Sequence, residues 1–170
     1  SDIEAGVVRA IGKPAERFVE DYIRLLRAIR FATVMEFDIE ESTWASIRAG
    51  ASNISQIAPE RIREELDRIW VHENRVRGFD LLVKSGLMKA IFPEILELRG
   101  CEQPPQWHPE GDVFVHTRLM LSLLPAVVSL PLVLSVLFHD IAKPATFSYD
   151  PAEDRIRFNG HDKLGADMTG

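Results

Sequence analysis

The chain is poor in cysteine and has no excess of positive charge. Its 170 residues include one cysteine, Cys101, and carry a formal net charge of −6. One cysteine excludes an internal disulfide and suits a reducing compartment, so we expect a cytoplasmic protein. The negative charge excludes a general attraction to nucleic acid, and any contact with RNA or nucleotides must come from a local patch.

One local group of positive charges lies in the first thirty residues. It consists of Arg9, Lys13, Arg17, Arg24, Arg27 and Arg30. Such a run is often only a solvated helix face, and it is also the place where an anionic ligand would bind. With 46% hydrophobic and 27% charged residues, the chain has enough apolar material for one good core or two small ones.

A long apolar stretch runs from Val113 to Phe138, and from Leu119 onwards its only polar side chains are three serines. Its length alone would permit a membrane span. Pro125 and Pro131 divide it into two segments of buried-helix length, and His139 and Asp140 follow it. We therefore predict two core helices and no membrane segment.

The segment Glu20 to Phe31 combines an apolar helical stripe with a narrow charged strip. Glu20, Arg24 and Arg27 recur at helical spacing, and Asp21 lies one turn before Arg24. These charged residues either form an intrahelical ion pair or recognise the edge of a nucleotide base. Because Asp accepts and Arg donates hydrogen bonds, a fixed pair matches the amine and ring nitrogen of adenine or cytosine.

The remaining pattern is helical and predicts an all-α fold in two parts. Ser42 and Thr43 are candidate caps of a short helix ending before Gly50, Pro59 begins a longer helix, and Gly86 ends another. The proline-rich segment from Gly100 to Gly111 is the predicted linker. We expect a helical module over residues 1–100 and a second helical module over 101–170, with a small hairpin near Asp150.

Three histidines and one aspartate in the second part form a candidate metal site. His116 lies in the first apolar segment, His139 and Asp140 follow the second, and His161 opens a later segment. Imidazoles and a carboxylate suit a divalent Mn, Fe, Ni or Zn ion, and separate helices can bring them together. A single histidine would more often be a satisfied core residue.

Three separate sequence segments, EDYIRLLRAIRF, PERIREEL and FHDIAKP, resemble motifs of the family of tRNA nucleotidyltransferases (CCA-adding enzymes) and bacterial poly(A) polymerases. The resemblance extends from Asp2 to about Ala166. It implies that Asp21 and Arg24 read the incoming base, with Arg27 in support, and that Glu60, Arg61, Ile62, Glu65 and Leu66 brace the same region.

FHDIAKP and the later GHDKLGA also resemble the HD phosphohydrolase superfamily. This resemblance implies metal at His116, His139, Asp140 and His161, and a phosphate contact by Lys143. Ala142 replaces a glycine common in that superfamily. The last carboxylate ligand is expected beyond Gly170, since the spacing of Asp162 and Asp167 does not match.

Together, the resemblances predict part of an RNA nucleotidyltransferase that uses ATP and CTP on the 3′ end of tRNA or another RNA. The family's catalytic palm, with its Mg²⁺-binding carboxylates, has no counterpart here, so we expect no nucleotidyl transfer by this chain alone. The alternatives are a metal-dependent HD phosphohydrolase of phosphate esters or cyclic phosphodiesters, and a noncatalytic RNA-binding fragment.

Overall fold

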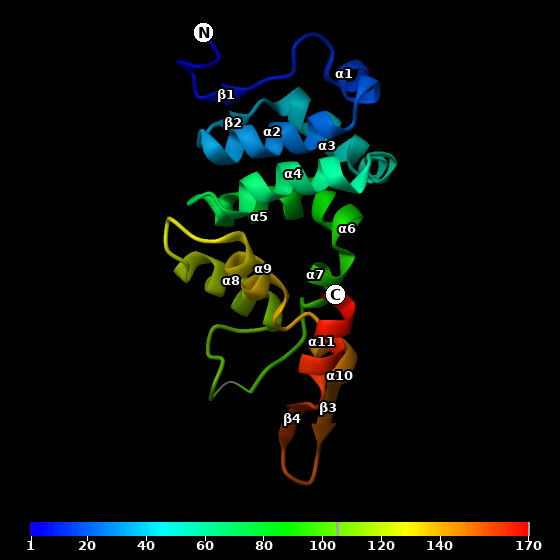
Figure 1. The fold of residues 1–170 in the computed structure, drawn as a ribbon, viewed down its shortest axis with the longest axis vertical. Helices are drawn as coiled ribbons and strands as arrows, with labels where there is room; N and C mark the ends of the chain where they lie inside the picture. The colour runs from blue at the N-terminus through cyan, green and yellow to red at the C-terminus, as the bar shows by residue number, and fades with distance from the viewer. Residues whose placement is uncertain (105, 170) are drawn as a thin grey trace. The chain divides into compact units, whose positions relative to one another are not determined.

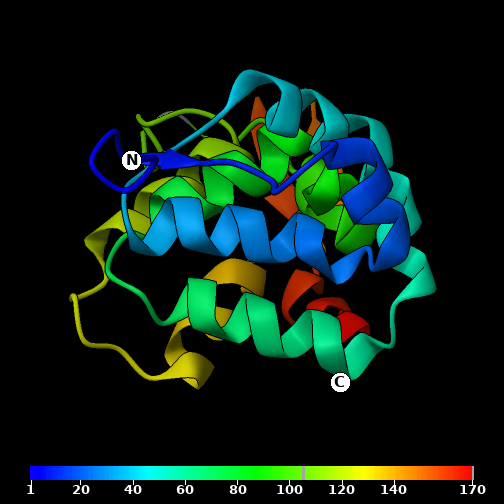
Figure 2. The same ribbon diagram turned by 90° about the horizontal axis from the view of Figure 1, so that it is seen from above.

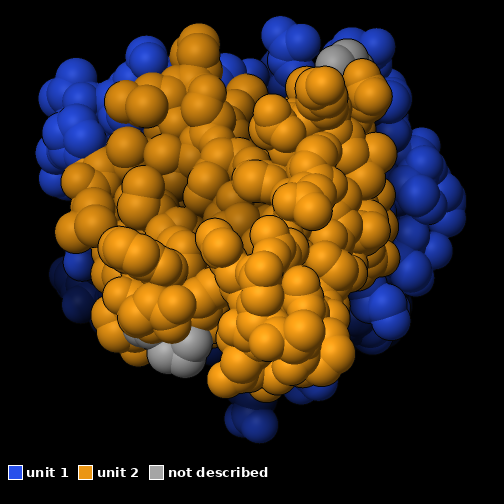
Figure 3. All heavy atoms as spheres, turned by 90° about the horizontal axis from the view of Figure 1, so that it is seen from below, with its two compact units in different colours: residues 1–91, 125–130 blue, residues 92–124, 131–170 orange. Residues whose placement is uncertain are grey.

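The computed structural model describes residues 1–104 and 106–169, and over them the chain is all-α with two small strand pairs (Figure 1). This confirms the predicted fold class and the predicted hairpin. The residues form two compact units, coloured separately in Figure 3. Unit 1 comprises residues 1–91 and 125–130, and unit 2 comprises residues 92–124 and 131–170.

Unit 1 is a helical body with one short parallel strand pair. Its elements are β1 (Val7–Val8), α1 (Pro14–Glu20), α2 (Ile23–Val34), β2 (Asp38–Ile39), α3 (Glu41–Gly50), the 3₁₀ helix η1 (Ala51–Gln56), α4 (Pro59–Trp70), α5 (Arg75–Ser85) and α6 (Leu87–Ile91). In the strand pair, Val7 lies opposite Asp38 and Val8 opposite Ile39.

The core of unit 1 forms where α2 and α4 lie side by side, as both ribbon views show (Figures 1 and 2). Leu25, Leu26 and Ile29 of α2 and Ile69 of α4 are fully buried. Burying such a side chain stabilises the fold by about 1.5–3 kcal/mol. The helical spacing of apolar residues in the sequence thus produces the core face of each helix.

Gly78 allows α5 to pack closely against its neighbours in unit 1. A Cβ atom at this position would lie 2.4 Å from Ile69 Cγ2 and 3.2 Å from Thr33 Cγ2. Real side chains do not approach so closely, so the packing of α5 on α4 and α2 requires a residue without a side chain here.

The helix boundaries follow the predicted signals in most places. Pro59 begins α4, and Gly86 ends α5 in the left-handed conformation with φ of 86°. The cap of α3 was predicted wrongly. Its N-cap is Glu40, whose side chain accepts a hydrogen bond from Thr43 N at 2.8 Å, so Ser42 and Thr43 lie inside the first turn.

Unit 2 contains further short helices and the hairpin. Its elements are α7 (Pro93–Glu97), α8 (Val113–Leu123), α9 (Leu130–Phe138, which joins this unit at Pro131), α10 (Lys143–Thr146), β3 (Phe147–Asp150), β4 (Arg155–Phe158) and α11 (His161–Thr169). In the hairpin, Phe147 lies opposite Phe158 and Asp150 opposite Arg155.

The apolar stretch divides into α8 and α9, as the two prolines predict. Over the described residues, no helix has both the length and the apolar character needed to cross a bilayer. The compact units separate between Ile91 and Phe92, whereas the sequence places the linker at Gly100 to Gly111. Pro105 of that linker lies outside the described residues, and the two-domain division remains a prediction.

Candidate functional site

The charged segment of unit 1 is broken at Asp21, where the sequence predicts one continuous helix. α1 ends at Glu20, Asp21 is extended with φ of −162° and ψ of 104°, and α2 begins at Ile23. Asp21 Oδ1 accepts a hydrogen bond from Ile23 N at 3.3 Å. Aspartate side chains commonly bond the backbone two residues ahead, and this local turn competes with the helix.

The break gives Asp21 and Arg24 different partners. Arg61 Nη2 donates to Asp21 Oδ2 at 2.8 Å, and Arg24 Nη1 donates to Glu20 Oε2 at 2.7 Å and to the Arg17 carbonyl at 2.9 Å. The Arg61 hydrogen bond lowers the pKa of Asp21 against the opposing effect of burial. Asp21 is therefore an ionised acceptor beside Arg61, while Glu60 is exposed in the first turn of α4.

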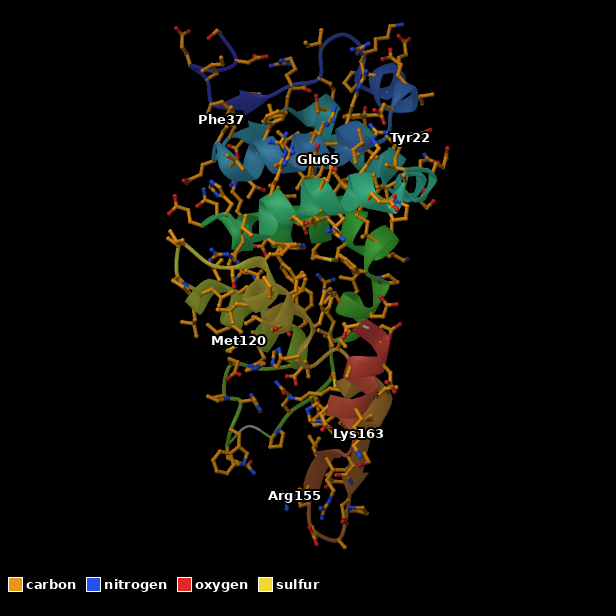
Figure 4. The ribbon with its side chains drawn as sticks, in the orientation of Figure 1. Tyr22, Phe37, Glu65, Met120, Arg155 and Lys163 are labelled. Atoms are coloured by element: carbon orange, nitrogen blue, oxygen red, sulfur yellow. The ribbon has the colours of Figure 1, made fainter. Side chains whose placement is uncertain are left out.

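Glu65 joins α4 to α2 through two arginines, and Figure 4 labels it between these helices. Its oxygens accept from Arg27 Nε at 3.0 Å and Arg30 Nε at 2.6 Å, and only 5% of its side chain is exposed. Burial opposes ionisation of this carboxyl, but the hydrogen bonds from Arg30 and Arg27 outweigh it and lower the pKa of Glu65. Arg27 is thus held by a buried anion.

Replacing Glu65 with alanine is expected to lower the free energy of unfolding by about 2–3 kcal/mol, because Arg30 loses its buried partner. The exposed Glu64 on the same helix is the matched control, and Glu64→Ala should change stability by less than about 0.5 kcal/mol. Denaturant unfolding monitored by circular dichroism measures both.

The pH dependence of this effect has a definite sign. Because the folded-state pKa of Glu65 is lowered, its stabilisation is present above the ordinary value of 4.5 and is lost as pH falls through the lowered pKa. The advantage of the wild type over Glu65→Gln should shrink on acidification. A difference that is constant with pH would contradict this account.

The basic residues of the first thirty positions are largely neutralised. Glu16 pairs with Lys13, Glu20 with Arg17 and Arg24, Glu65 with Arg27 and Arg30, and Asp2 and Glu40 with Arg9. Four of them nevertheless line a hollow of about 270 Å³ in unit 1. Its lining is Val8, Arg9, Ala10, Ile11, Arg17, Phe18, Arg24, Arg27, Ala28, Phe31 and Thr43. A lining that combines apolar side chains with four arginines suits a flat, anionic ligand.

Unit 2 brings the predicted metal-site residues together. His116 Nε2 lies 3.3 Å from His139 Nε2 and 3.9 Å from Asp140 Oδ2, and His139 Nε2 lies 3.0 Å from the same oxygen. His116, His139 and Asp140 form a set whose ligand atoms all lie within 4.8 Å of one another. His161 stands outside this set, with its Nε2 3.8 Å from Asp140 Oδ1.

The partners of the imidazoles determine which nitrogen is free. His139 Nδ1 lies 2.8 Å from the Val136 carbonyl, and His116 Nδ1 lies 2.6 Å from Glu110 Oε1. Both partners only accept, so each of these rings carries a hydrogen on Nδ1. His161 follows the same pattern, with Nδ1 2.7 Å from the Phe158 carbonyl. The two Nε2 atoms lie 3.3 Å apart, within hydrogen-bond distance, and a metal ion bound between them would take the place of the shared hydrogen.

Asp140 completes this cluster as a buried anion. Burial opposes its ionisation, but His139 and Lys143 outweigh this and lower the pKa of Asp140 to about 2. Lys143 Nζ lies 2.8 Å from Asp140 Oδ2 and donates to Gln103 Oε1 at 2.6 Å. Among the described residues, Oδ2 has ion-pair contacts but no partner with hydrogen-bond geometry. The Asp140 carboxylate and the converging imidazole nitrogens are ligand types that fit a divalent first-row metal.

A second hollow, of about 350 Å³, adjoins the cluster through Lys143 and His161. Its lining is Pro104, Trp107, His108, Lys143, Arg155, Ile156, Arg157, Phe158, Asn159 and His161. Figure 4 labels Arg155 on the hairpin, whose strand β4 contributes the basic side of the hollow. Cationic and aromatic groups beside a metal-type cluster suit an anionic, ring-containing ligand.

Two residues of this site were missed from the sequence, Glu110 and His108. Glu110 Oε1 lies 3.1 Å from His108 Nδ1 as well as 2.6 Å from His116 Nδ1. The pKa of Glu110 is lowered to about 2 by its own backbone N–H and by the two histidines, so its carboxylate is ionised. The signal was a histidine and a glutamate two residues apart just before the helix that carries His116.

Comparisons with known proteins give the chain its relatives. Residues 36–98 match the family profile described as "Probable RNA and SrmB- binding site of polymerase A". The "Multifunctional CCA protein" of Thioalkalivibrio sulfidiphilus is 32% identical over 99% of this chain and 41% of that protein. The protein of the same name from Nitrosospira multiformis is 36% identical over 95% of this chain and 38% of that protein.

A solved structure shows the same fold. The "Structure of tRNA-processing enzyme complex 3" matches with a TM-score of 0.50 and 19% identity, over 80% of this chain and 41% of that one. The chain spans about two fifths of the length of the curated relatives named above. From its similarity to these proteins over nearly its whole length and from the profile match at residues 36–98, the chain corresponds to part of a member of the family of CCA-adding enzymes and poly(A) polymerases.

Proposed function

We propose that this chain is part of a template-independent RNA nucleotidyltransferase that adds CMP and AMP to the 3′ end of tRNA, or AMP residues as poly(A). The observation that carries the proposal is the similarity to multifunctional CCA proteins along nearly the whole chain. Its partners are tRNA or another RNA 3′ end, with ATP and CTP as substrates. The Mg²⁺ ions of the transfer reaction belong to carboxylates that we assign to another part of the protein.

Within this function, Asp21 and Arg24 select the base. Arg24 and Arg27 line the 270 Å³ hollow, and Asp21 lies at the break between α1 and α2. The hydrogen bond from Arg61 to Asp21 supports the proposed bracing role of Arg61, and Glu60 precedes it at the start of α4. To meet a base, Arg24 exchanges its bonds to Glu20 and Arg17 for the ring nitrogen.

The isolated chain is expected to extend no RNA, because the magnesium-binding carboxylates are assigned elsewhere. The test incubates it with labelled ATP and CTP, Mg²⁺ and a tRNA lacking its 3′ end, with a full-length family member as the positive control. Binding of the tRNA without extension is the expected result. Extension by the pure chain would overturn the division of roles, and absence of binding would leave only the hydrolase candidate.

A second candidate function for unit 2 is metal-dependent hydrolysis of phosphate esters or cyclic phosphodiesters. The convergence of His116, His139 and Asp140 favours it, with His161 nearby. A divalent ion bound there would supply the Lewis acidity that polarises a phosphoryl oxygen. Lys143 and the basic lining from β4 would hold the phosphate. If unit 2 binds no metal and hydrolyses no ester, it is a noncatalytic RNA-binding body.

A further inference from the structure

We propose that Glu110, supported by His108, is a positioning residue that aims His116 at the metal site of unit 2. This inference rests on the metal-dependent candidate function of that unit. Glu110 lies on the far side of the His116 ring from Asp140, since it contacts Nδ1 while Nε2 faces the cluster. It therefore acts on the metal through the ring and is not itself a ligand.

The geometry of Glu110 sets the orientation of His116. Its Oε1 lies 2.6 Å from His116 Nδ1, and only 15% of the His116 side chain and 17% of the Glu110 side chain are exposed. At this distance the carboxylate oxygen accepts a hydrogen bond from Nδ1, so in a neutral ring the lone pair is on Nε2, which faces the cluster. A carboxylate also makes the ring a stronger electron donor to a metal.

The three histidines differ in what holds them. His139 and His161 are fixed by backbone carbonyls, those of Val136 and Phe158. A carbonyl is present whatever side chain occupies its residue, so these two orientations are built into the backbone. Among the described residues, His116 alone of the three is held at Nδ1 by a side chain, and a substitution at Glu110 removes that support.

The surrounding loop holds Glu110 in place. Gly111 has φ of 123°, a conformation that favours glycine. Asp112 then caps α8 by accepting from Val115 N at 2.9 Å, and its other oxygen accepts from Gly100 N at 2.7 Å. His108 contacts the same Oε1 and packs edge-on against the His116 ring, with centroids 4.8 Å apart. The loop is therefore braced on both sides of Glu110.

The test measures zinc affinity and ring tautomers in the whole chain. Calorimetric titration with Zn²⁺ alone should show that Glu110→Ala raises Kd by about 10- to 100-fold, the usual effect of losing such an outer partner. Glu110→Gln, whose amide oxygen still accepts, should lie between alanine and wild type. Glu102→Ala, an exposed carboxylate change in the same loop, should leave Kd within about twofold of the wild-type value.

Nitrogen-15 NMR of the histidine rings measures the tautomer of His116, which would not change if Glu110 only stabilised the fold. Without metal, His116 should carry its hydrogen on Nδ1 in the wild type and become a mixture of tautomers in Glu110→Ala, with His139 unchanged. A folded Glu110→Ala variant with wild-type Kd and tautomer would overturn the proposal. It would also be overturned if zinc binding were lost in Glu110→Ala but kept in Asp140→Asn, because the ion would then lie at His108, Glu110 and His116.

The experiments distinguish failure of the metal-dependent function from failure of the positioning role of Glu110. If the wild-type chain binds no zinc, the metal-dependent candidate function fails, while the tautomer of His116 still reports whether Glu110 orients the ring. If zinc binds at His139 and Asp140 but neither Kd nor tautomer responds to Glu110, only the positioning role fails.

Discussion

Replacing Asp140 with asparagine, or His139 with alanine, is expected to abolish tight divalent-metal binding by unit 2 and to lower any phosphodiesterase activity by about 10³-fold or more. Lewis-acid catalysis contributes several kcal/mol, and each 1.36 kcal/mol corresponds to a factor of ten in rate. The two side chains could bind the same metal ion, because Asp140 Oδ2 lies 3.0 Å from His139 Nε2. Zn²⁺ or Mn²⁺ titration and hydrolysis of bis(p-nitrophenyl) phosphate measure the two effects.

Two variants separate loss of the site from loss of the fold. Asp140→Asn removes the buried charge that faces Lys143, so its thermal stability must be measured beside its activity. His139→Ala removes a side chain that is 35% exposed and disturbs packing less. Asp167→Ala, an exposed acidic residue of α11, is the control. Metal affinity that survives in both cluster variants would rule out this site and the hydrolase candidate with it.

In the full-length enzyme of the proposed function, Asp21→Ala combined with Arg24→Ala is expected to flatten the preference among the four nucleotides and to leave slow addition intact. Guanine and uracil present donor and acceptor in the opposite order, and each buried polar group left unpaired costs about 1–3 kcal/mol. That corresponds to a discrimination of about 10- to 1000-fold in kcat/KM, which the double variant should lose.

Misincorporation of UTP and GTP by the variant, relative to wild type, measures this loss. Arg63→Ala with Asp67→Ala provides a matched control, because these residues form an i, i+4 ion pair on α4 with N–O distance 3.6 Å. Its nucleotide preference should stay that of the wild type. A double variant at Asp21 and Arg24 that is slow but still strict for ATP and CTP would show that these residues only stabilise the helix ends.

Much of the fold follows from local sequence signals. Pro59 and Gly86 mark helix ends because their backbone preferences act without help from the rest of the chain. The break at Asp21 was missed because the apolar period continues through it, while an aspartate side chain bonded to Ile23 N diverts the backbone. The spacing of apolar residues indicates which face of a helix is buried. A single side-chain hydrogen bond can interrupt the helix without changing that spacing.

In the candidate sites, the site residues could be predicted from the sequence, but their partners could not. The residues at the cluster of His116, His139 and Asp140 were predicted from their types and their places on separate apolar segments. The partners of each charge were not predictable, since Arg61 meets Asp21 across 40 positions and Lys143 meets Gln103 across the same separation. Such pairs are set by tertiary packing, and sequence spacing carries information only about neighbours on one element.

The guanidinium group of Arg24 has one set of hydrogen-bond partners in this structure and would need a different set to recognise a base. Its Nη1 closes the end of α1 by donating to the Arg17 carbonyl and Glu20, and the proposed recognition of a base needs the same guanidinium. Two equilibria that draw on one group are coupled, and the coupling free energy is reciprocal. Under the proposed function, an interaction that stabilises the last turn of α1 would weaken base binding, and a bound base would destabilise that turn by the same free energy.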